Sequence, residues 1–457
     1  MVDLLVEFLL VLSTLALLAA TAGLATQAAA ALALRDRPFP SAAVRPRTAI
    51  LVPAHNEIAA IAATAAHLKS QMMPVDRLVI VADNCSDRTA ELAIRAGAEV
   101  VVRNDLARKG KGFALEAGLH YLRKNPPDVV LFVDADCRLS PGCLDALARA
   151  CAGAGAPVQC LYLMQVNPAS EGQSRLAEFA WRIRNDLRPT GCARLGLPCQ
   201  LFGTGMMFPW SVIDPSDFAT GHVTEDLLIG LRCAMKGALV RFLRSVSVVS
   251  YFPATAVGSV LQQRRWLHGH LQIAFREAPR LLVAAIKHRS FALAALAADL
   301  LIPPLVLSAF AVNGMFALTL GFGLLAGVWT PAALAGMAVA LYSAFLTAAW
   351  FYCGRDIIGR AELAEVPRHI RRVLRAAVDF LSGTRSGWVR AERLGDFSVG
   401  ASLTRRQRAA EAEKGPADRT SARHLHDQTL RIKAGPAALS EHRVPSGCGC
   451  GQAGEHR

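Results

Sequence analysis

The sequence predicts an α/β protein in which a mainly parallel, Rossmann-like sheet is joined to about three transmembrane helices. Two observations support this class. Short apolar runs rich in β-branched residues alternate with helical stretches between residues 48 and 252, which is the pattern of βαβ units. Apolar blocks long enough to cross a bilayer stand on both sides of that region.

The first element is a membrane anchor, expected within residues 1–36. Residues 8–34 contain no charged side chain and exceed the roughly 20 residues that a bilayer requires. A cleaved signal peptide is the alternative, because small residues cluster at residues 28–30. Asp3 and Glu7 stand where a signal peptide carries basic residues, and the apolar stretch is too long, so a retained anchor is favoured.

Residues 47–256 are expected to form one domain of alternating strands and helices. Four strands are predicted in the segments AILVPA, RLVIVAD, EVVVR and DVVLFV, with helices between them, the first over residues 58–71. The turn after the first strand reads PAHNE, so the glycine fingerprint of a nicotinamide or flavin enzyme is absent there. The G-x-x-x-x-G-K-[ST] frame of a P-loop is missing from the KGKG turn as well.

Acidic residues follow several of these runs. Asp83 ends the second strand, Asp134 and Asp136 follow the fourth, and Glu225 and Asp226 open a later helix. Because a parallel sheet binds ligands in the crevice at the carboxyl ends of its strands, these carboxylates are expected to converge. Asp134 and Asp136 can share a divalent cation, Mg²⁺ or Mn²⁺, that holds a diphosphate. A solvated turn and a helix cap are the alternatives for the two acidic pairs.

Basic and aromatic residues complete the predicted site. Lys111 lies in the KGKG turn, where a lysine can contact phosphate. Gly205 belongs to a G-x-G pair that lets the backbone approach a ligand closely, although an ordinary turn uses the same residues. Gln262, Arg265 and Trp266 lie on an amphipathic segment. An aromatic ring and a guanidinium can bind a sugar and a diphosphate, or lie at headgroup depth on an interfacial helix, and both can hold at once.

The C-terminal part returns to the membrane. An interfacial amphipathic region at 257–290 precedes two expected transmembrane helices within 291–354, the first kinked at Pro303 and Pro304. A basic amphipathic segment at 355–403 and a basic tail at 404–457, expected to be disordered, follow. Arginines flank the first and the last apolar blocks, so the positive-inside rule predicts a multi-pass protein of the inner (plasma) membrane with a cytoplasmic α/β domain.

The acidic motifs and the QxxRW motif, taken in order, resemble the membrane-bound family 2 glycosyltransferases. That group includes the cellulose, hyaluronan and poly-N-acetylglucosamine synthases and ceramide glucosyltransferase. The resemblance covers residues 48–266 and the membrane arrangement. It implies a GT-A-type domain that binds a UDP-sugar, a divalent cation on the diphosphate, and inversion at the anomeric carbon.

The resemblance also implies a role for each matching residue. Asp226, with Glu225 beside it, would take the proton from the acceptor hydroxyl. Lys111 would help to neutralise the diphosphate. The remaining residues would bind the nucleotide (Pro53, Glu57, Asp83, Asp134), the metal (Asp136, with Asp134), and the diphosphate and acceptor (Gly205, Gln262, Arg265, Trp266).

These features predict an enzyme of exopolysaccharide or cell-surface glycan synthesis. Transfer of one sugar to a membrane lipid and a catalytically silent assembly subunit are the alternatives. The processive synthases have more spans and build a polymer channel, so three spans point to an export partner, a homo-oligomer or a lipid-linked acceptor. Nucleic acid is not an expected partner, because the net charge of +14 is explained by arginines that flank the membrane blocks.

Overall fold

The computed structural model describes residues 2–166, 175–253 and 256–382. The chain divides into two compact units, residues 1–396 and 397–457, and every element named below belongs to the first. The predicted basic tail at 404–457 and the part of the 355–403 segment beyond residue 382 lie outside the described residues.

An eight-stranded sheet in the order β3-β2-β1-β4-β7-β6-β8-β5 forms the centre of the α/β domain. The four strands predicted from the sequence are present and pair in parallel. β7 runs antiparallel between β4 and β6, and β5 runs antiparallel to β8, so the sheet is mixed. The strands are β1 (Thr48–Ala54), β2 (Arg77–Asp83), β3 (Glu99–Arg103), β4 (Val129–Phe132), β5 (Arg138–Leu139), β6 (Val158–Gln165), β7 (Met206–Pro209) and β8 (Arg241–Tyr251).

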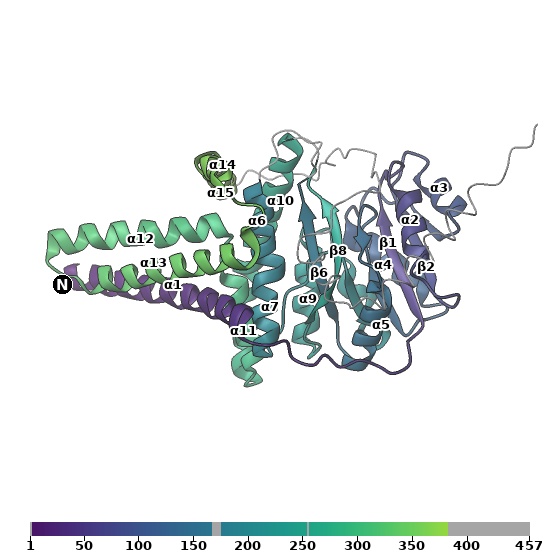
Figure 1. Ribbon diagram of the computed structural model, residues 1–457, viewed down its shortest axis with the longest axis horizontal. Coiled ribbons are helices and arrows are strands. Elements are labelled where there is room, and N and C mark those ends of the chain that lie inside the picture. Colours follow the sequence, from purple (N-terminus) through teal and green to yellow (C-terminus); the bar gives the residue numbers. More distant parts are fainter. Residues whose placement is uncertain (1, 167–174, 254–255, 383–457) are drawn as a thin grey trace, which may run out of the picture. The chain divides into compact units, whose positions relative to one another are not determined.

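The core of this domain lies on both faces of the central strands. β1, β2 and β4 are almost wholly buried along their length, as expected for continuous apolar runs covered by helices on each side (Figure 1). Phe132, Phe208 and Phe218 pack together at the middle of this core. The helices of the domain are α2 (Ile61–Lys69), α3 (Thr89–Arg95), α4 (Lys111–Leu122), α5 (Cys143–Ala154), η2 (Trp210–Val212), α8 (Pro215–Phe218) and α9 (Glu225–Met235).

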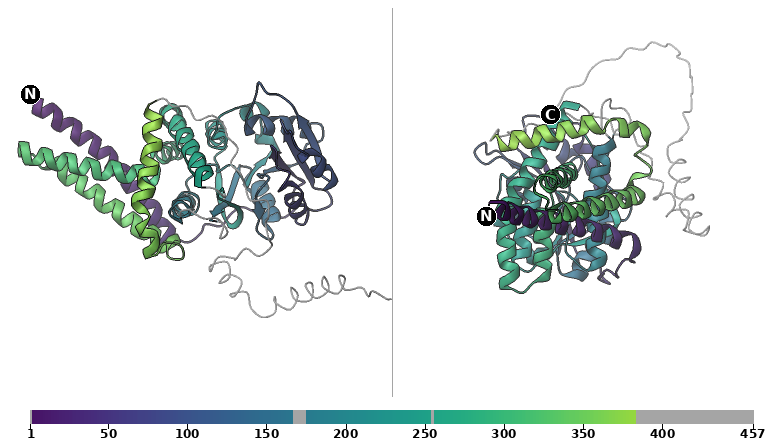
Figure 2. Two further views of the ribbon diagram at one scale, coloured as in Figure 1. Left: turned by 90° about the horizontal axis from the view of Figure 1, so that it is seen from above. Right: turned by 90° about the vertical axis from the view of Figure 1, so that its left-hand side faces the viewer.

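Three helical segments are long and apolar enough to cross a membrane. They are Leu4–Ala33 within α1 (Val2–Ala33), α12 (Leu305–Ala326), and Thr330–Gly354, which joins α13 (Thr330–Ala349) to the π-helix η3 (Trp350–Gly354). Figures 1 and 2 show the three side by side, with α13 in contact with both α1 and α12. The prediction of about three transmembrane helices agrees with this finding.

The second apolar block divides differently from the prediction. A single kinked span is expected there, but the chain forms two separate helices, α11 (Phe291–Leu301) and α12. Pro303 and Pro304 lack the N–H groups that a continuous helix requires, so the helix ends before them. α11 packs instead against α10 (Ala256–Lys287) through an apolar cluster that includes Leu281 and Leu293.

A layer of helices lies between the sheet and the three spans. It consists of α6 (Arg175–Arg182), the π-helix η1 (Ile183–Leu187), α7 (Arg188–Leu195) and α10, with α14 (Arg360–Ala364) and α15 (Val366–Leu381) beside it (Figure 1). Arg188 joins the layer to the membrane helices, because its Nη2 lies 2.6 Å from Asp299 Oδ1 and its Nε donates to Gln27 Oε1 at 3.1 Å. We call α6, η1 and α7 the junction helices.

Candidate active site

The acidic residues predicted from the sequence meet around the ammonium group of Lys111. Lys111 Nζ lies 2.6 Å from Asp134 Oδ1 and 3.4 Å from Glu225 Oε1, and it donates to the Gly203 carbonyl at 2.6 Å. Asp226 lies beside them, because a Cβ added to Gly203 would stand 3.3 Å from Asp226 Oδ2 and 3.7 Å from Lys111 Nζ. Residues from four separate segments of the chain therefore form one polar cluster.

Glycines place Lys111 at the centre of this cluster. Lys111 begins α4, and Gly110 before it has φ 137°, a conformation that other residues rarely adopt. A Cβ on Gly112 would stand 2.5 Å from the Phe218 carbonyl oxygen, so only glycine lets α4 approach the segment after α8 this closely. The two glycines of the KGKG turn thus allow the close packing that directs Lys111 toward the cluster. Lys111 itself contacts the carboxylates of Asp134 and Glu225.

Burial and neighbouring charges shift the proton affinities of the cluster. Burial raises the pKa of Glu225 to about 7, although Lys111 lowers it. Burial likewise raises the pKa of Asp226, and the positive charges of Arg184 and Lys111 oppose that rise. Burial disfavours the charged form of Lys111, but the charges of Asp134 and Glu225 outweigh it and raise the pKa of Lys111. A fixed cation beside a carboxylate of raised pKa is suited to acid–base chemistry near neutral pH.

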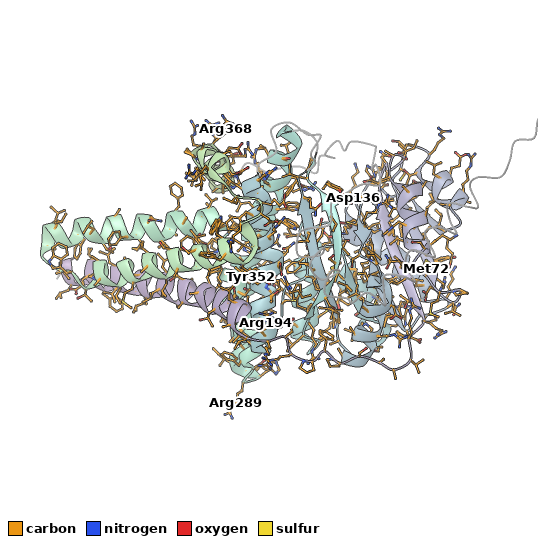
Figure 3. All side chains as sticks on the ribbon, in the orientation of Figure 1. Met72, Asp136, Arg194, Arg289, Tyr352 and Arg368 are labelled. Atoms are coloured by element: carbon orange, nitrogen blue, oxygen red, sulfur yellow. The ribbon has the colours of Figure 1, made fainter. Side chains whose placement is uncertain are left out.

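Asp136 is the most enclosed carboxylate of the D-x-D motif. Its side chain is buried, and its Oδ2 accepts a hydrogen bond from Ser250 Oγ at 2.8 Å. Ligand atoms of Asp134, Asp136 and Cys137 lie within 4.8 Å of one another. Carboxylate oxygens are the ligands that Mg²⁺ and Mn²⁺ prefer, so the two aspartates fit such an ion while the thiol does not. In Figure 3, Asp136 lies beside the sheet, between the junction helices and the β1–β2 side.

The residues predicted to contact the nucleoside lie at the ends of β1 and β2. Pro53 is in β1, Glu57 is in the loop after it, and Asp83 is the last residue of β2. Arg103 Nη1 donates to Asp83 Oδ1 at 2.5 Å, and Asn84 Nδ2 donates to the same oxygen at 3.0 Å. The pairing of Asp83 with Arg103 was not evident from the sequence, because it depends on the register between β2 and β3. The contact of Pro53, Glu57 and Asp83 with a nucleotide stays a prediction.

Gly205 has a packing reason to be glycine. A Cβ at this position would stand 2.4 Å from Cys160 Sγ and 2.8 Å from Val248 Cγ2, and the Gly205 N–H donates to the Phe132 carbonyl at 2.9 Å. Packing alone therefore explains why this residue is glycine. Its contact with the acceptor or the diphosphate stays a prediction. Gly203, which faces the Lys111 cluster with φ 91°, is the glycine placed for close backbone approach.

The QxxRW residues lie on α10, next to an aromatic cluster formed by Tyr162, Trp181, Phe252 and Trp266. The Trp266 ring packs on Trp181 of α6, with centroids 4.9 Å apart and an interplanar angle of 38°. Gln262 is buried, and its Oε1 has no hydrogen-bond partner among the described residues. Arg265 is half-buried one position before Trp266. Trp266 therefore packs against the core of the α/β domain, and the contacts of Gln262, Arg265 and Trp266 with a ligand stay predictions.

A cavity of about 200 Å³ adjoins this aromatic cluster on the side of the spans. Sequence reasoning missed this cavity, whose polar lining residues include Arg184 of η1 and His270 of α10. The run WRIRNDLR over the junction helices offered a signal, being both basic and aromatic. It did not show which arginine would face the cavity.

Comparison with solved structures defines the class of the fold. The mannosyltransferase PcManGT from Pyrobaculum calidifontis, solved in complex with GDP-Man and Mn²⁺, aligns with 82% of this chain and 100% of its own, with a TM-score of 0.51 at 19% identity. The α/β domain therefore has a GT-A-like fold, of the kind found in glycosyltransferases that use nucleotide-sugars.

Family models identify the chain more closely. The model for glycosyl transferase family 2 matches residues 49–202, and the model for glycosyl transferase family group 2 matches residues 129–353. Together they span residues 49–353, more than half of the 457 residues. The chain belongs to glycosyl transferase family 2.

Two further relatives share smaller parts of the chain. The probable glycosyltransferase YdaM of Bacillus subtilis (strain 168) is 33% identical over 99 residues, which are 20% of this chain and 23% of that protein. The chain therefore matches less than a quarter of that relative's length. Glucosyl-3-phosphoglycerate synthase from Mycobacterium tuberculosis, in complex with Mn²⁺, UDP and glucosyl-3-phosphoglycerate, covers 49% of this chain and 80% of its own, with a TM-score of 0.32 at 19% identity.

Proposed function

We propose that this protein is an inverting, metal-dependent hexosyltransferase that moves a sugar from a UDP-sugar to a hydroxyl acceptor at the cytoplasmic face of the plasma membrane. Its product would be an exopolysaccharide or another cell-surface glycan. The observation that carries the proposal is the convergence of Lys111, Asp134, Glu225 and Asp226 at the carboxyl edge of the sheet. The GDP-Man and Mn²⁺ bound to PcManGT support a nucleotide-sugar donor and a metal.

In the proposed mechanism, Asp226 is the general base. The acceptor oxygen attacks the anomeric carbon, its proton passes to Asp226, and the bond to the diphosphate breaks with its electron pair on the leaving nucleotide. Attack from the face opposite the diphosphate inverts the anomeric configuration. Burial raises the pKa of Asp226, which makes the carboxylate a stronger base, and a positioned base of this kind contributes about 10²–10⁴-fold.

Positive charge stabilises the leaving diphosphate. Lys111, held by Asp134 and the Gly203 carbonyl, supplies a fixed cation in the cluster. Asp134 and Asp136 are the residues that would hold Mg²⁺ or Mn²⁺, and the ion would neutralise the charge that develops on the diphosphate. Arg265 of α10 is proposed to contribute from the opposite side.

Transfer of a single sugar to a membrane lipid is a second candidate. The cavity of about 200 Å³ favours it, because its wall includes residues of the membrane helices. A catalytically silent assembly subunit is less well supported, since such a subunit needs neither the carboxylates nor the lysine that contact one another at the sheet edge.

Nucleotide release by the purified protein in lipid nanodiscs tests the proposal. A panel of UDP- and GDP-sugars is supplied with Mn²⁺, with Mg²⁺ or with EDTA, and Asp136→Ala and Asp226→Asn are measured beside the unmodified protein. Asp145→Asn is the matched control, because Asp145 is an exposed aspartate of α5 that pairs only with arginines.

The expected result is metal-dependent release from one donor, lost in both site variants and kept in the control. An Asp226→Asn protein that retains most of its transfer rate would remove the base assignment. Folded protein that neither binds nor cleaves any donor would favour the silent subunit.

A further inference from the structure

Arg184 differs from the other arginines of the junction helices. It forms no hydrogen bond or ion pair with any described residue, and its guanidinium carbon lies 5.8 Å from the centroid of the Trp181 ring. The other four arginines of these helices all have acidic partners. The pairs are Arg175–Glu362, Arg182–Asp356, Arg188–Asp299 and Arg194–Asp36.

The position of Arg184 links the catalytic cluster to the cavity. It lies in the π-helix η1, whose wider turn alters the direction of side chains relative to an α-helix. Its side chain lines the cavity of about 200 Å³, and its charge lowers the pKa of Asp226. The charges of Asp226 and Asp299 act on this guanidinium, but neither carboxylate forms an ion pair with it, so an anion that contacts it directly is the ligand expected beside it. Arg372 of α15 lines the same cavity and adds positive charge, as do Arg188 and Arg264, which pair with Asp299 and Asp379.

The remaining wall of the cavity contains further polar side chains, such as Gln200, Gln263 and His369, and an apolar part that reaches the spans. Trp181 and Trp266 form the side next to the aromatic cluster. The opposite side is formed by residues of α1, of the break between α11 and α12, of α12 and of α13. These are Leu24, Ile302, Pro303, Leu305, Val306 and Phe345. A ligand that fills the cavity therefore has an anionic group near Arg184 and an apolar part directed toward the membrane helices.

We propose that the acceptor is a membrane lipid with a phosphate in its headgroup, and that Arg184 binds this phosphate. The inference rests on the proposed function, because it names the acceptor of the same site. The cavity is smaller than the roughly 300–1,000 Å³ of pockets that enclose a whole small-molecule ligand. It holds the headgroup and the first carbons of the chain, and the rest of the hydrocarbon lies along the membrane helices.

Photo-cross-linking tests this assignment directly. The full chain is placed in nanodiscs of an uncharged galactolipid, which contain no phosphate, and is exposed to decyl phosphate that carries a diazirine on the first carbons of its chain. We expect cross-links on peptides that contain residues 177–188, 260–270 or 302–308. Unlabelled decyl phosphate should compete at least about tenfold better than uncharged decyl glycerol, the effect of one charge-assisted hydrogen bond. Inorganic phosphate, which lacks the chain, should compete more weakly still.

Two variants separate the anionic and the apolar parts of the site. Arg184→Gln keeps a polar side chain of similar length and should lower the cross-linking yield at least about tenfold. Ala180→Leu adds three carbons to the cavity wall and should lower the yield for decyl phosphate and decyl glycerol alike. Arg280→Gln is the matched control, because Arg280 is an exposed arginine of α10 whose partner is Glu277. It should not change the yield.

Several outcomes would overturn the proposal. Equal competition by inorganic phosphate would indicate an anion site without a lipid, and equal competition by decyl glycerol would remove the anionic requirement. Unchanged cross-linking in Arg184→Gln, together with weaker nucleotide binding, would assign this residue to the donor. Nucleotide-sugar binding by the unmodified protein in the same nanodiscs reports the proposed function separately. If the unmodified protein binds no nucleotide-sugar, the proposed function is overturned. If it binds a nucleotide-sugar but does not prefer decyl phosphate over decyl glycerol, only the acceptor assignment is overturned.

Discussion

The sheet edge and the junction helices arrange charge in opposite ways. At the sheet edge, one lysine contacts Asp134 and Glu225, and Asp226 lies beside them, so negative charge is in excess. In the junction helices, every arginine except Arg184 is paired with a carboxylate, as Arg188 is with Asp299. At the sheet edge, burial raises the pKa of Glu225 and Asp226, as the proposed chemistry requires, whereas the pairs of the junction helices neutralise buried charge and attach these helices to the spans. Changes in the first region should alter rate, and changes in the second should alter stability.

The largest effect is expected at the sheet edge. Asp226→Asn removes the proposed base and should lower the rate of sugar transfer by about 10²–10⁴-fold or more. The melting temperature should stay equal or rise, because a neutral amide replaces a half-buried carboxylate. Transfer rates and thermal unfolding of the purified protein measure the two effects. A large decrease in melting temperature together with the loss of rate would contradict the expectation that changes at the sheet edge alter rate and not stability.

The junction should respond in the opposite sense. Arg188→Leu leaves Asp299 without its arginine, and breaking such a mostly buried pair costs about 3–5 kcal/mol of the free energy of unfolding. The double variant Arg188→Leu, Asp299→Leu removes both charges and should recover part of that loss. Thermal unfolding of the two single variants and the double variant forms a double-mutant cycle. Strictly additive losses would show that the pair is not coupled.

A smaller loss of stability is expected where α7 meets α1. A Cβ on Gly191 would stand 2.1 Å from the Gln27 carbonyl oxygen, so Gly191→Ala must separate the two helices. Overpacking of this kind costs about 1–3 kcal/mol. Gly23→Ala in α1 is the control, because nothing lies within 4 Å of its added Cβ. Its melting temperature should be unchanged or higher, and an equal decrease in both variants would argue against the close contact.

The smallest expected effect is a change in the pH dependence of the transfer rate, because Arg184 of the junction helices acts on Asp226 at the sheet edge. The base acts when ionised, so the transfer rate should rise with pH as the carboxyls lose their protons. Arg184→Gln removes a positive charge that lowers the pKa of Asp226, so this rise should move to higher pH. Each pKa unit changes the rate at a fixed low pH by about tenfold. Profiles of kcat/KM against pH should show the shift in Arg184→Gln and not in Arg280→Gln; a profile unchanged in both would separate Arg184 from the base.

The sequence was sufficient for those features that follow from periodicity and topology. Asp83 and Asp134 end apolar runs, and parallel strands must deliver such residues to one edge of the sheet. The location of Arg184 was not predictable, because the π-helix depends on tertiary packing and has no period of its own in the sequence. Gly205 was predicted for its backbone freedom, yet its contact with Cys160 becomes visible only once β6 and β7 are paired.

The apolar cluster that joins the junction helices to the spans bears on how the protein is made. Leu24 and Ala28 emerge first, Ile183 and Leu187 emerge midway, and the last partners lie at residues 338–353. The cluster closes only after the third span has been synthesised, and until then Ile183 and Leu187 can pack only on its earlier members, such as Leu24 and Ala28. Formation of the last of the three helices is therefore expected to be a late step in the maturation of the α/β domain, and activity should appear only after this helix has formed.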